Sequence, residues 1–272
     1  MSRKQKKRKI ARHLEIMGIH PSGKGWTLFQ GRKVFIPNTI TGEIISGEIV
    51  YGGSEFLSGI LIEIEKQHPY RREPVCKHFK LCGGCLWQHI QYPYQLQLKS
   101  QILDEALNYK GIPFKEIKPI IPSENEFFYR NQLTFSFSSQ RWFYDEEGKI
   151  DDTKDRRAVG FNVAQLSNRI VDITECYLQP EPSVSIARQT KKMAQDLNVS
   201  FFNFKDGSGI LRSLEILQDS TQNVIVMIGF ASQPDEAAFR FLEHLFTDMP
   251  GVKSVFWKVY SNPFKAFGEM EV

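Results

Sequence analysis

The chain has 272 residues, of which 41% are hydrophobic and 24% are charged. This length is large for one compact core and predicts two domains, and the composition is that of a globular chain rather than a disordered or collagen-like one. No apolar run approaches the roughly 20 residues that cross a membrane, and no apolar stretch follows the basic N-terminus as a secretory signal would require. We therefore expect a cytoplasmic protein with no membrane contact.

The net charge of +4 is concentrated at the N-terminus. Residues 1–12 carry seven Lys or Arg and no acidic residue, whereas the other 260 residues hold 28 basic and 31 acidic side chains, a net charge of −3. Such a basic arm can bind phosphates and steer a nucleic acid toward the protein. The alternative is a solvated tail without a ligand.

Residues 13–65 alternate short apolar segments with turn signals such as PSGKG and TITGE. Short strands at this spacing predict a small β-barrel of the OB type, because closure of the sheet removes exposed strand edges. We expect this barrel to be a single small module.

Residues 66–93 form a loop-rich segment that contains three of the four cysteines. The stretch from Lys66 to Lys99 contains six basic residues and one acidic residue, Glu73, and aromatic residues lie among the basic ones. Cations and rings together suit an RNA surface, because both stack on unpaired bases.

Residues 94–272 predict an α+β domain with a mainly antiparallel sheet. Helical periodicity follows Pro93 and recurs at about 181–197 and 234–246. Strand patterns occupy residues 127–138, 141–149, 158–164, 168–173, 199–204, 210–217, 223–230 and 251–260.

The cysteines follow a three-plus-one pattern. Cys76, Cys82 and Cys85 form the segment CKHFKLCGGC, and Cys176 follows 90 residues later. Disulfides are rare in the cytoplasm, so closely spaced thiols indicate a metal site. We expect the Gly83-Gly84 pair to let the backbone turn tightly between two of the ligands.

The identity of the metal is a separate question. Structural zinc usually takes two local pairs of ligands, whereas one local loop with a distant fourth thiolate is common for a [4Fe-4S] cluster. The spacing favours the cluster, with zinc and unligated core cysteines as the alternatives. Because four cysteines would fill every iron position, such a cluster would be structural, electron-transferring or RNA-facing.

The segment CKHFKLCGGCLWQHIQYPYQLQLKSQILDEAL closely resembles the RNA uracil-5-methyltransferase family, in particular the iron-sulfur branch that forms 5-methyluridine in 23S ribosomal RNA. The Gln88-His89 pair, Tyr94 and the segment IVDITECYL around Cys176 match further features of that family. The resemblance implies that residues 13–65 are a TRAM barrel and that Cys76, Cys82, Cys85 and Cys176 bind a [4Fe-4S] cluster. It also implies that the protein is a monomer and that its partner is structured RNA, with 23S ribosomal RNA as the expected one.

The family continues into a C-terminal Rossmann-like domain that binds S-adenosylmethionine and carries the catalytic cysteine. Methylation at C5 of uracil requires a nucleophilic thiolate, and all four thiols here are assigned to metal. The glycine-rich turn of a nucleoside site is also missing from the pattern. We therefore expect the catalytic domain to be absent, this chain to be inactive alone, and its catalytic residues and S-adenosylmethionine site to lie elsewhere.

The resemblance also implies candidates for RNA contact, namely Lys24, Arg32 and Lys33 on the barrel and Arg130 in the segment FFYRNQ. Each of these cations could equally be a solvated surface residue, since phosphate contacts are individually dispensable. Two other functions stay open: a free-standing, non-catalytic RNA-binding module with a four-cysteine iron-sulfur or zinc site, and a zinc-stabilised structural protein.

Overall fold

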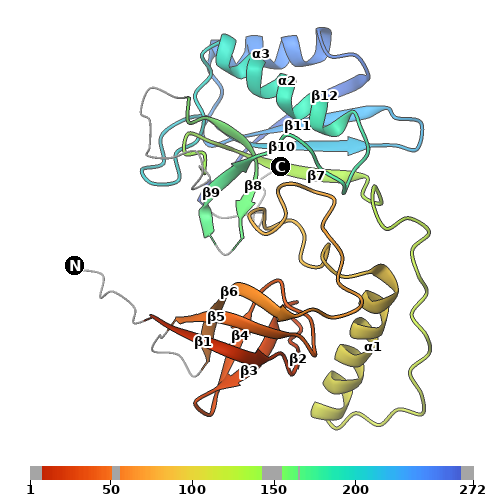
Figure 1. Cartoon of the computed structure of the whole chain (residues 1–272). Coiled ribbons are helices and arrows are strands. Elements are labelled where there is room, and N and C mark those ends of the chain that lie inside the picture. Colours follow the sequence, from red (N-terminus) through yellow and green to blue (C-terminus); the bar gives the residue numbers. More distant parts are fainter. Residues whose placement is uncertain (1–7, 51–55, 143–154, 165, 265–272) are drawn as a thin grey trace. The chain divides into compact units, whose positions relative to one another are not determined.

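The computed structural model describes residues 8–50, 56–142, 155–164 and 166–264 (Figure 1). The chain divides into two compact units, residues 1–75 with 85–124 and residues 76–84 with 125–272. The division differs from the predicted one, because the segment 76–84 belongs to the second unit and the helix after it belongs to the first. A boundary at residue 94 therefore does not describe how the chain packs.

The first unit contains a six-stranded, barrel-like sheet. Its strands are β1 (Arg8–Glu15), β2 (Gly18–Ile19), β3 (Gly25–Phe29), β4 (Arg32–Ile36), β5 (Ile44–Val50) and β6 (Leu57–Lys66), in the order β1-β5-β6-β4-β3-β2. The stretch 8–19 pairs with β5 at its start and with β3 at its end, so the same stretch of chain borders both edges of the sheet. This closure agrees with the predicted barrel.

Alternating apolar residues form the barrel core. Val34 and Ile36 on β4 and Ile45 and Ile49 on β5 are fully buried and pack together. Strand β1 begins at Arg8, which corrects the predicted arm: residues 8–12 belong to the sheet, and residues 1–7 lie outside the described part. Arg8 to Ala11 pair with Val50 to Gly47 of β5, and Ala11 is buried in the barrel core.

Helix α1 (Tyr92–Tyr109) follows the cysteine segment, with Pro93 at its first turn as predicted. Its single fully buried residue, Leu98, packs against Ile19 and Ile40 of the barrel and against Ile90. This cluster explains why α1 belongs to the first unit.

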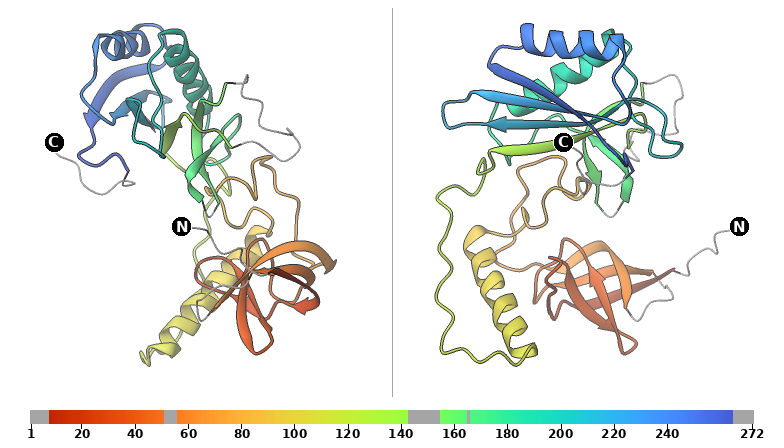
Figure 2. Two further views of the ribbon diagram at one scale, coloured as in Figure 1. Left: turned by 90° about the vertical axis from the view of Figure 1, so that its left-hand side faces the viewer. Right: turned by 180° about the vertical axis from the view of Figure 1, so that it is seen from behind.

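The second unit is an α+β unit with one six-stranded sheet. Its strands are β7 (Gln132–Ser138), β8 (Ala158–Val163), β9 (Leu166–Asp172), β10 (Leu211–Gln218), β11 (Val224–Phe230) and β12 (Val252–Val259), in the order β12-β11-β10-β7-β8-β9. All neighbouring pairs are antiparallel except β11 and β12, which are parallel. Helices α2 (Ser183–Asp196) and α3 (Glu236–Thr247) lie on one face of this sheet (Figure 2). The mainly antiparallel α+β prediction is confirmed.

Two predicted strand segments have other structures. Residues 127–131 are not part of β7, because the N–H groups of Phe128 and Arg130 donate instead to the carbonyls of Tyr177 and Leu178. Residues 199–204 form only an isolated bridge between Phe201 and Leu211. The predicted strand 141–149 lies mostly outside the described residues.

Among the described helices, none is both long enough and apolar enough to cross a membrane.

Candidate metal centre and nucleic-acid interface

The segment between Cys76 and Cys82 is a compact run of turns. The N–H of Phe79 donates to the carbonyl of Cys76 at 3.0 Å, and the N–H of Cys82 donates to the carbonyl of His78 at 2.8 Å. Lys80 has a left-handed backbone with φ 73°, whereas Gly83 and Gly84 do not. The expected tight turn is present at Gly83 and Gly84, and neither glycine has a positive φ. A side chain at Gly83 would crowd β8, since a Cβ there would lie 3.1 Å from the carbonyl oxygen of Asn162.

Strand β8 anchors the Cys82 end of this segment. Cys82 forms an antiparallel bridge with Val163, and the N–H of Gly83 donates to the carbonyl of Asn162 at 2.9 Å. A third bond runs from the N–H of Ala164 to the carbonyl of Leu81 at 2.8 Å. Backbone hydrogen bonds to β8 therefore hold the chain around Cys82.

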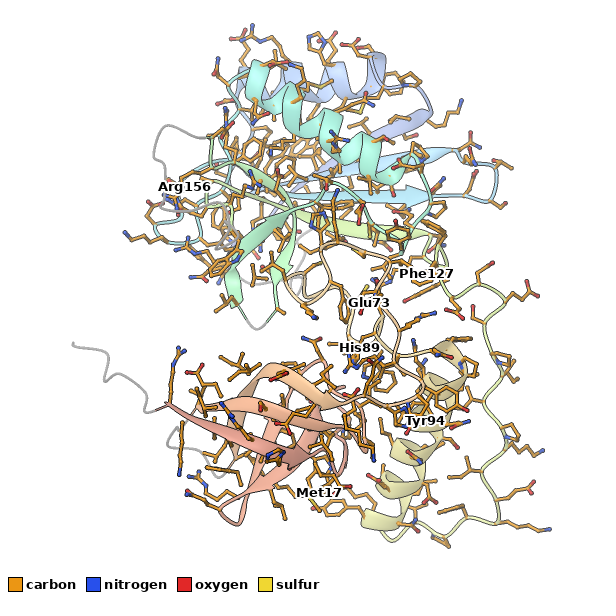
Figure 3. All side chains as sticks on the ribbon, in the orientation of Figure 1. Met17, Glu73, His89, Tyr94, Phe127 and Arg156 are labelled. Carbon is orange, nitrogen blue, oxygen red and sulfur yellow. The ribbon has the colours of Figure 1, made fainter. Side chains whose placement is uncertain are left out.

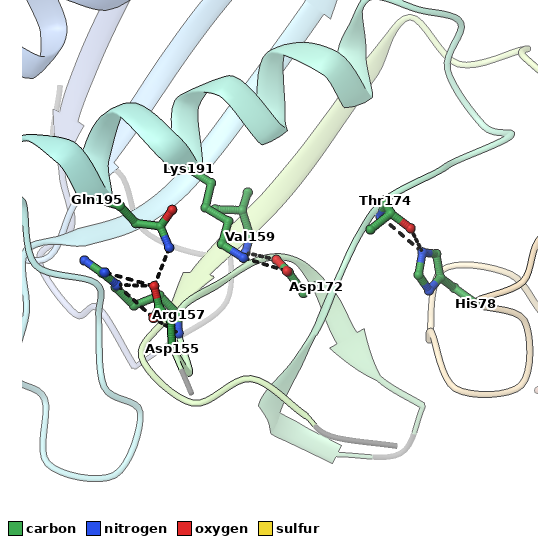
Figure 4. A network of polar contacts seen from close by, with 8 residues as sticks. All are labelled: His78, Asp155, Arg157, Val159, Asp172, Thr174, Lys191 and Gln195. Atoms are coloured by element: carbon green, nitrogen blue, oxygen red, sulfur yellow. Dashed lines mark hydrogen bonds and ion pairs between the residues drawn. The ribbon is translucent and has the colours of Figure 1, made fainter. Parts of the chain in front are cut away.

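The Cys76 end is held against the chain just before Cys176. The N–H of Lys77 donates to a carboxylate oxygen of Glu175 at 2.7 Å. The ring of His78 meets Thr174, whose N–H donates to Nε2 at 3.1 Å and whose Oγ1 lies 3.0 Å from the same nitrogen (Figure 4). The structure therefore brings the neighbours of Cys76 and Cys176 together, although they are about a hundred residues apart in sequence.

His78 is a packing residue in this arrangement. Its side chain is buried, and burial lowers the pKa of the imidazole, with a further contribution from the positive charge of Lys77. The neutral ring accepts the Thr174 N–H at Nε2. That nitrogen is committed to the backbone, so His78 orders the segment rather than offering a metal ligand there.

All four predicted ligands are half-buried thiols, and none forms a disulfide. The N–H of Gly84 donates to the Sγ of Cys82 at 3.4 Å. Within the described part of the chain, no group of three or more His, Cys, Asp or Glu side chains is arranged to hold one metal ion. The metal centre at Cys76, Cys82, Cys85 and Cys176 therefore stays a prediction.

The basic stretch around the cysteines is less available to a ligand than its sequence suggests. Arg71 is bound to the carboxylate of Glu43 through Nε at 2.6 Å and Nη2 at 2.7 Å, and both side chains are buried. The Nε of Arg72 donates to the carbonyl of Gln88 at 3.1 Å. These two arginines therefore stabilise the first unit, and the exposed cations of the stretch are Lys66, Lys77, Lys80 and Lys99.

The aromatic residues of the stretch are divided in the same way. The rings of Tyr70 and Tyr94 stack with their centroids 5.0 Å apart, and Tyr94 lies on α1 (Figure 3). Phe79 is buried, and the Nε1 of Trp87 donates to the carbonyl of Gly23 at 2.9 Å. Tyr70, which is 40% exposed, is thus the ring of this stretch with the most open surface among those described.

The β3–β4 hairpin of the barrel offers a cation among aromatic rings. The Nζ of Lys33 lies 4.7 Å from the ring centroid of Trp26, and Trp26 is paired across the strands with Phe35. Phe35 in turn contacts the rings of His20 and Phe56 at centroid distances of 4.8 and 5.5 Å. Sequence reasoning selected Lys33 but missed these rings, although the alternation Trp26-Leu28 and Lys33-Phe35 places all four side chains on one face.

The other predicted contacts are dispersed. Lys24 precedes β3, and its carbonyl accepts the N–H of His20 at 2.8 Å. Arg32 is half-buried at the start of β4, beside the hairpin turn. Arg130 is exposed on the second unit, where its backbone N–H is bound to the carbonyl of Leu178 at 2.9 Å. Lys33 is the predicted contact that lies over an aromatic ring, that of Trp26.

Comparison with known proteins places this arrangement in context. No protein-family model matches the chain. An uncharacterized RNA methyltransferase of Porphyromonas gingivalis is 29% identical over 95% of this chain and 57% of its own length. A second, from Bacteroides thetaiotaomicron, is 30% identical over 76% of this chain and 46% of its own length. The chain thus spans about half the length of the curated relatives it matches.

A solved structure shares the fold. The tRNA (uracil-54, C5)-methyltransferase of Pyrococcus abyssi, in complex with S-adenosyl-L-homocysteine, aligns with a TM-score of 0.64 and 19% identity. The alignment covers 96% of this chain and 55% of that one. This likeness shows a shared fold, and the sequence relatives confirm that the chain is similar to RNA methyltransferases, as the resemblance predicted.

Proposed function

We propose that this chain is the RNA-recognition and [4Fe-4S]-binding portion of a S-adenosylmethionine-dependent RNA uracil-5-methyltransferase. The observation that carries the proposal is the similarity to RNA methyltransferases over 95% of the chain. The neighbour's bound S-adenosyl-L-homocysteine supports use of S-adenosylmethionine by the whole enzyme. We assign methyl transfer to a part of that enzyme outside this chain, and we propose 23S ribosomal RNA in the cytoplasm as its substrate.

Cys76, Cys82, Cys85 and Cys176 are the proposed ligands of the cluster. The donor set suits iron, because four thiolates are the usual ligands of a [4Fe-4S] cluster. The bonds of Lys77 and His78 to Glu175 and Thr174 support the proposal, because they bring the segments of Cys76 and Cys176 together. When bound, the cluster would supply a cross-link between the two segments, and the N–H of Gly84 would stabilise the charge on the Cys82 sulfur.

Metal analysis tests this assignment. Anaerobically purified chain should contain about four iron and four sulfide per molecule, and Cys82→Ser or Cys176→Ser should lose most of both. Val75→Ser is the matched control, because it places the same side chain next to Cys76 without removing a sulfur. One zinc per chain and no iron would establish the zinc alternative, and the absence of any metal from wild-type protein would refute both.

Residues on the β3–β4 hairpin are the proposed RNA contacts of the barrel. The Lys33 ammonium beside Trp26, with Phe35 next to it, combines a phosphate-binding charge with surfaces that stack on bases. Lys24 and Arg32 extend the charge along the hairpin, and Arg130 adds a cation on the second unit. The basic residues before Arg8 would add attraction that does not depend on RNA sequence.

RNA binding can be measured by fluorescence anisotropy as a function of salt. Lys33→Glu should weaken binding of a 23S ribosomal RNA fragment and lower the salt slope by about one, which is the value for one lost phosphate contact. Lys192→Glu, on the exposed surface of α2, is the control. Deletion of residues 1–7 should flatten the slope further, and this deletion spares β1.

A methylation assay separates the proposal from a free-standing RNA-binding module. The full-length enzyme that contains this portion should form 5-methyluridine in RNA. Lys33→Glu in that enzyme should reduce methylation in proportion to the loss of RNA binding. An enzyme that methylates tRNA but not ribosomal RNA would retain the family assignment and refute the proposed substrate.

A further inference from the structure

Strand β12 lies at one edge of the sheet in the second unit. It pairs in parallel with β11, from Val252 beside Val224 to Val259 beside Phe230. Alternate N–H and C=O groups of β12 therefore point away from β11, and no strand of the described residues pairs with this side, the outer edge of β12. Its eight residues are long enough to pair with a further strand.

The outer edge has little of the protection that edge strands usually carry. Natural edge strands are commonly short, or they contain charges, proline or bulges that hinder pairing with another chain. A bulge and the exposed Lys253 lie at the start of β12, whereas the four residues from Ser254 to Trp257 carry no charge. The second cation of the strand, Lys258, is bound to Glu215 of β10. The middle of β12 is therefore open to pairing.

Aromatic side chains are exposed on both faces of this edge. Phe256 is 51% exposed and lies on the same face as its partner on β11, Met227. Trp257 is 45% exposed and lies on the face that carries α3, where its ring centroid is 6.0 Å from that of Phe239. Both faces thus present apolar surface at the point where the described strands of the sheet end, and such surface is typical of an interaction site.

Helix α3 extends this surface beyond the strand. Phe239 and Phe246 are half-exposed, and with Leu242 and Glu243 they form the helix side of a groove of about 590 Å³ along β12. A helix is about 10 Å wide and covers two strands that lie about 4.8 Å apart. Because α3 packs mainly on β12, there is room for one more strand beneath it. The charged residues of the groove are Glu243 and Lys253, so it has no net positive charge to attract RNA.

We propose that the outer edge of β12 binds a β-strand from the part of the methyltransferase outside this chain, with apolar side chains of that strand packed against Phe239 and Phe246. The added strand would pair with the outward N–H and C=O groups of β12 and would cover Phe256 and Trp257. The length of the relatives supports this occupant, because the chain spans 57% and 46% of two of them and each has a further portion that could supply a strand. The inference rests on the proposed function, which assigns methyl transfer to that portion.

Hydrogen exchange followed by mass spectrometry tests the proposal on the 272-residue chain and on the full-length enzyme that contains it. Peptides from β12 should exchange at least about tenfold more slowly in the full-length enzyme, because the bonds to the added strand must open before exchange. Peptides from β5 in the barrel are the internal control and should exchange at the same rate in both proteins. Equal exchange of β12 in the two proteins would overturn the proposal.

Phe246→Glu separates the docking of a strand from folding of the second unit. Because Phe246 is half-exposed, the substitution should change the Tm of the 272-residue chain by less than about 2 °C. In the full-length enzyme it should raise the exchange of β12 toward the rate in the 272-residue chain, and Phe256→Lys, on the opposite face of β12, should do the same. Phe114→Glu replaces an exposed phenylalanine of the first unit and should have neither effect. Full protection of β12 in both groove variants would contradict the proposal.

Other occupants would give other results. If light scattering shows that the 272-residue chain is a dimer with β12 protected, or if RNA protects β12, the proposed occupant is wrong. The two proposals also fail separately. A full-length enzyme that protects β12 but forms no 5-methyluridine would refute the proposed function and retain the added strand. One that forms 5-methyluridine without protection of β12 would refute the added strand alone.

Discussion

Replacement of Glu43 by Gln tests whether one buried ion pair fixes the chain where it leaves the barrel for the cysteine segment. Glu43 is fully buried, and its carboxylate accepts two bonds from Arg71 and one from the N–H of Ile40 at 2.9 Å. The N–H of His68 lies 3.3 Å from the same carboxylate. Every acceptor position is therefore filled by a donor.

The expected loss follows from this geometry. Glu43→Gln would place an amide N–H₂ where donors already converge, and the guanidinium of Arg71 would lose its counter-charge in a buried site. Removing one member of such a pair costs about 3–5 kcal/mol. This is a large fraction of a typical domain stability of about 5–15 kcal/mol, and it corresponds to a drop in Tm of roughly 10–20 °C.

The control is Glu48→Gln, which removes the carboxylate that pairs with Arg8 at 3.1 Å on the barrel surface. An exposed pair contributes at most about 1 kcal/mol. Denaturant unfolding followed by circular dichroism gives both free energies, and hydrogen exchange of β5 and β6 shows that the change lies in the first unit. A cost for Glu43→Gln as small as that of Glu48→Gln would refute the argument.

Three further predictions concern the second unit. Lys191→Met should lower the free energy of unfolding by about 1–3 kcal/mol, because it removes the ammonium that lies 2.6 Å from the mostly buried carboxylate of Asp172 (Figure 4). Lys192→Met breaks an exposed pair on the same helix and should lower it by less than about 0.5 kcal/mol in the same unfolding assay. Gly160→Ala should prevent stable folding, because its Cβ would lie 1.9 Å from the carbonyl oxygen of Val171; native circular dichroism with normal stability would contradict this steric reasoning. The pKa of Asp219 is lowered from 3.8 to about 2, so its stabilising effect is complete above its unfolded pKa and is lost as the pH falls toward 2. Asp219→Asn should therefore flatten the dependence of the unfolding free energy on pH between 2 and 4. An unchanged slope would show that the bonds of Asp219 persist on unfolding.

Much of the fold follows from local sequence signals. Alternation in residues such as Val34 and Ile36 predicts barrel strands, and helical periodicity with Pro93 at the first turn predicts α1. These signals depend on near neighbours in the chain. The assignment of α1 to the first unit depends instead on contacts of Leu98 with Ile19 and Ile40, which are remote in sequence.

The strand errors have a comparable cause. The segment 127–131 is rich in aromatic residues and so predicts a strand, but its backbone pairs with residues 177 and 178 after β9. Residues 199–204 are apolar because Phe201 and Phe202 are buried, and burial alone does not distinguish a strand from an irregular segment. In both cases the deciding partner lies far along the chain.

The candidate site shows the same division between what spacing predicts and what the folded chain adds. Spacing selected the four cysteines without specifying how Cys76 would approach Cys176. The bonds between Lys77 and Glu175 and between His78 and Thr174 bring those segments together, and none of them uses a sulfur atom. The backbone of Cys82 is likewise fixed by Val163. Because these bonds do not use sulfur, a Cys→Ser substitution should separate metal binding from folding of the second unit, and a metal would bind to segments whose conformational entropy is already reduced.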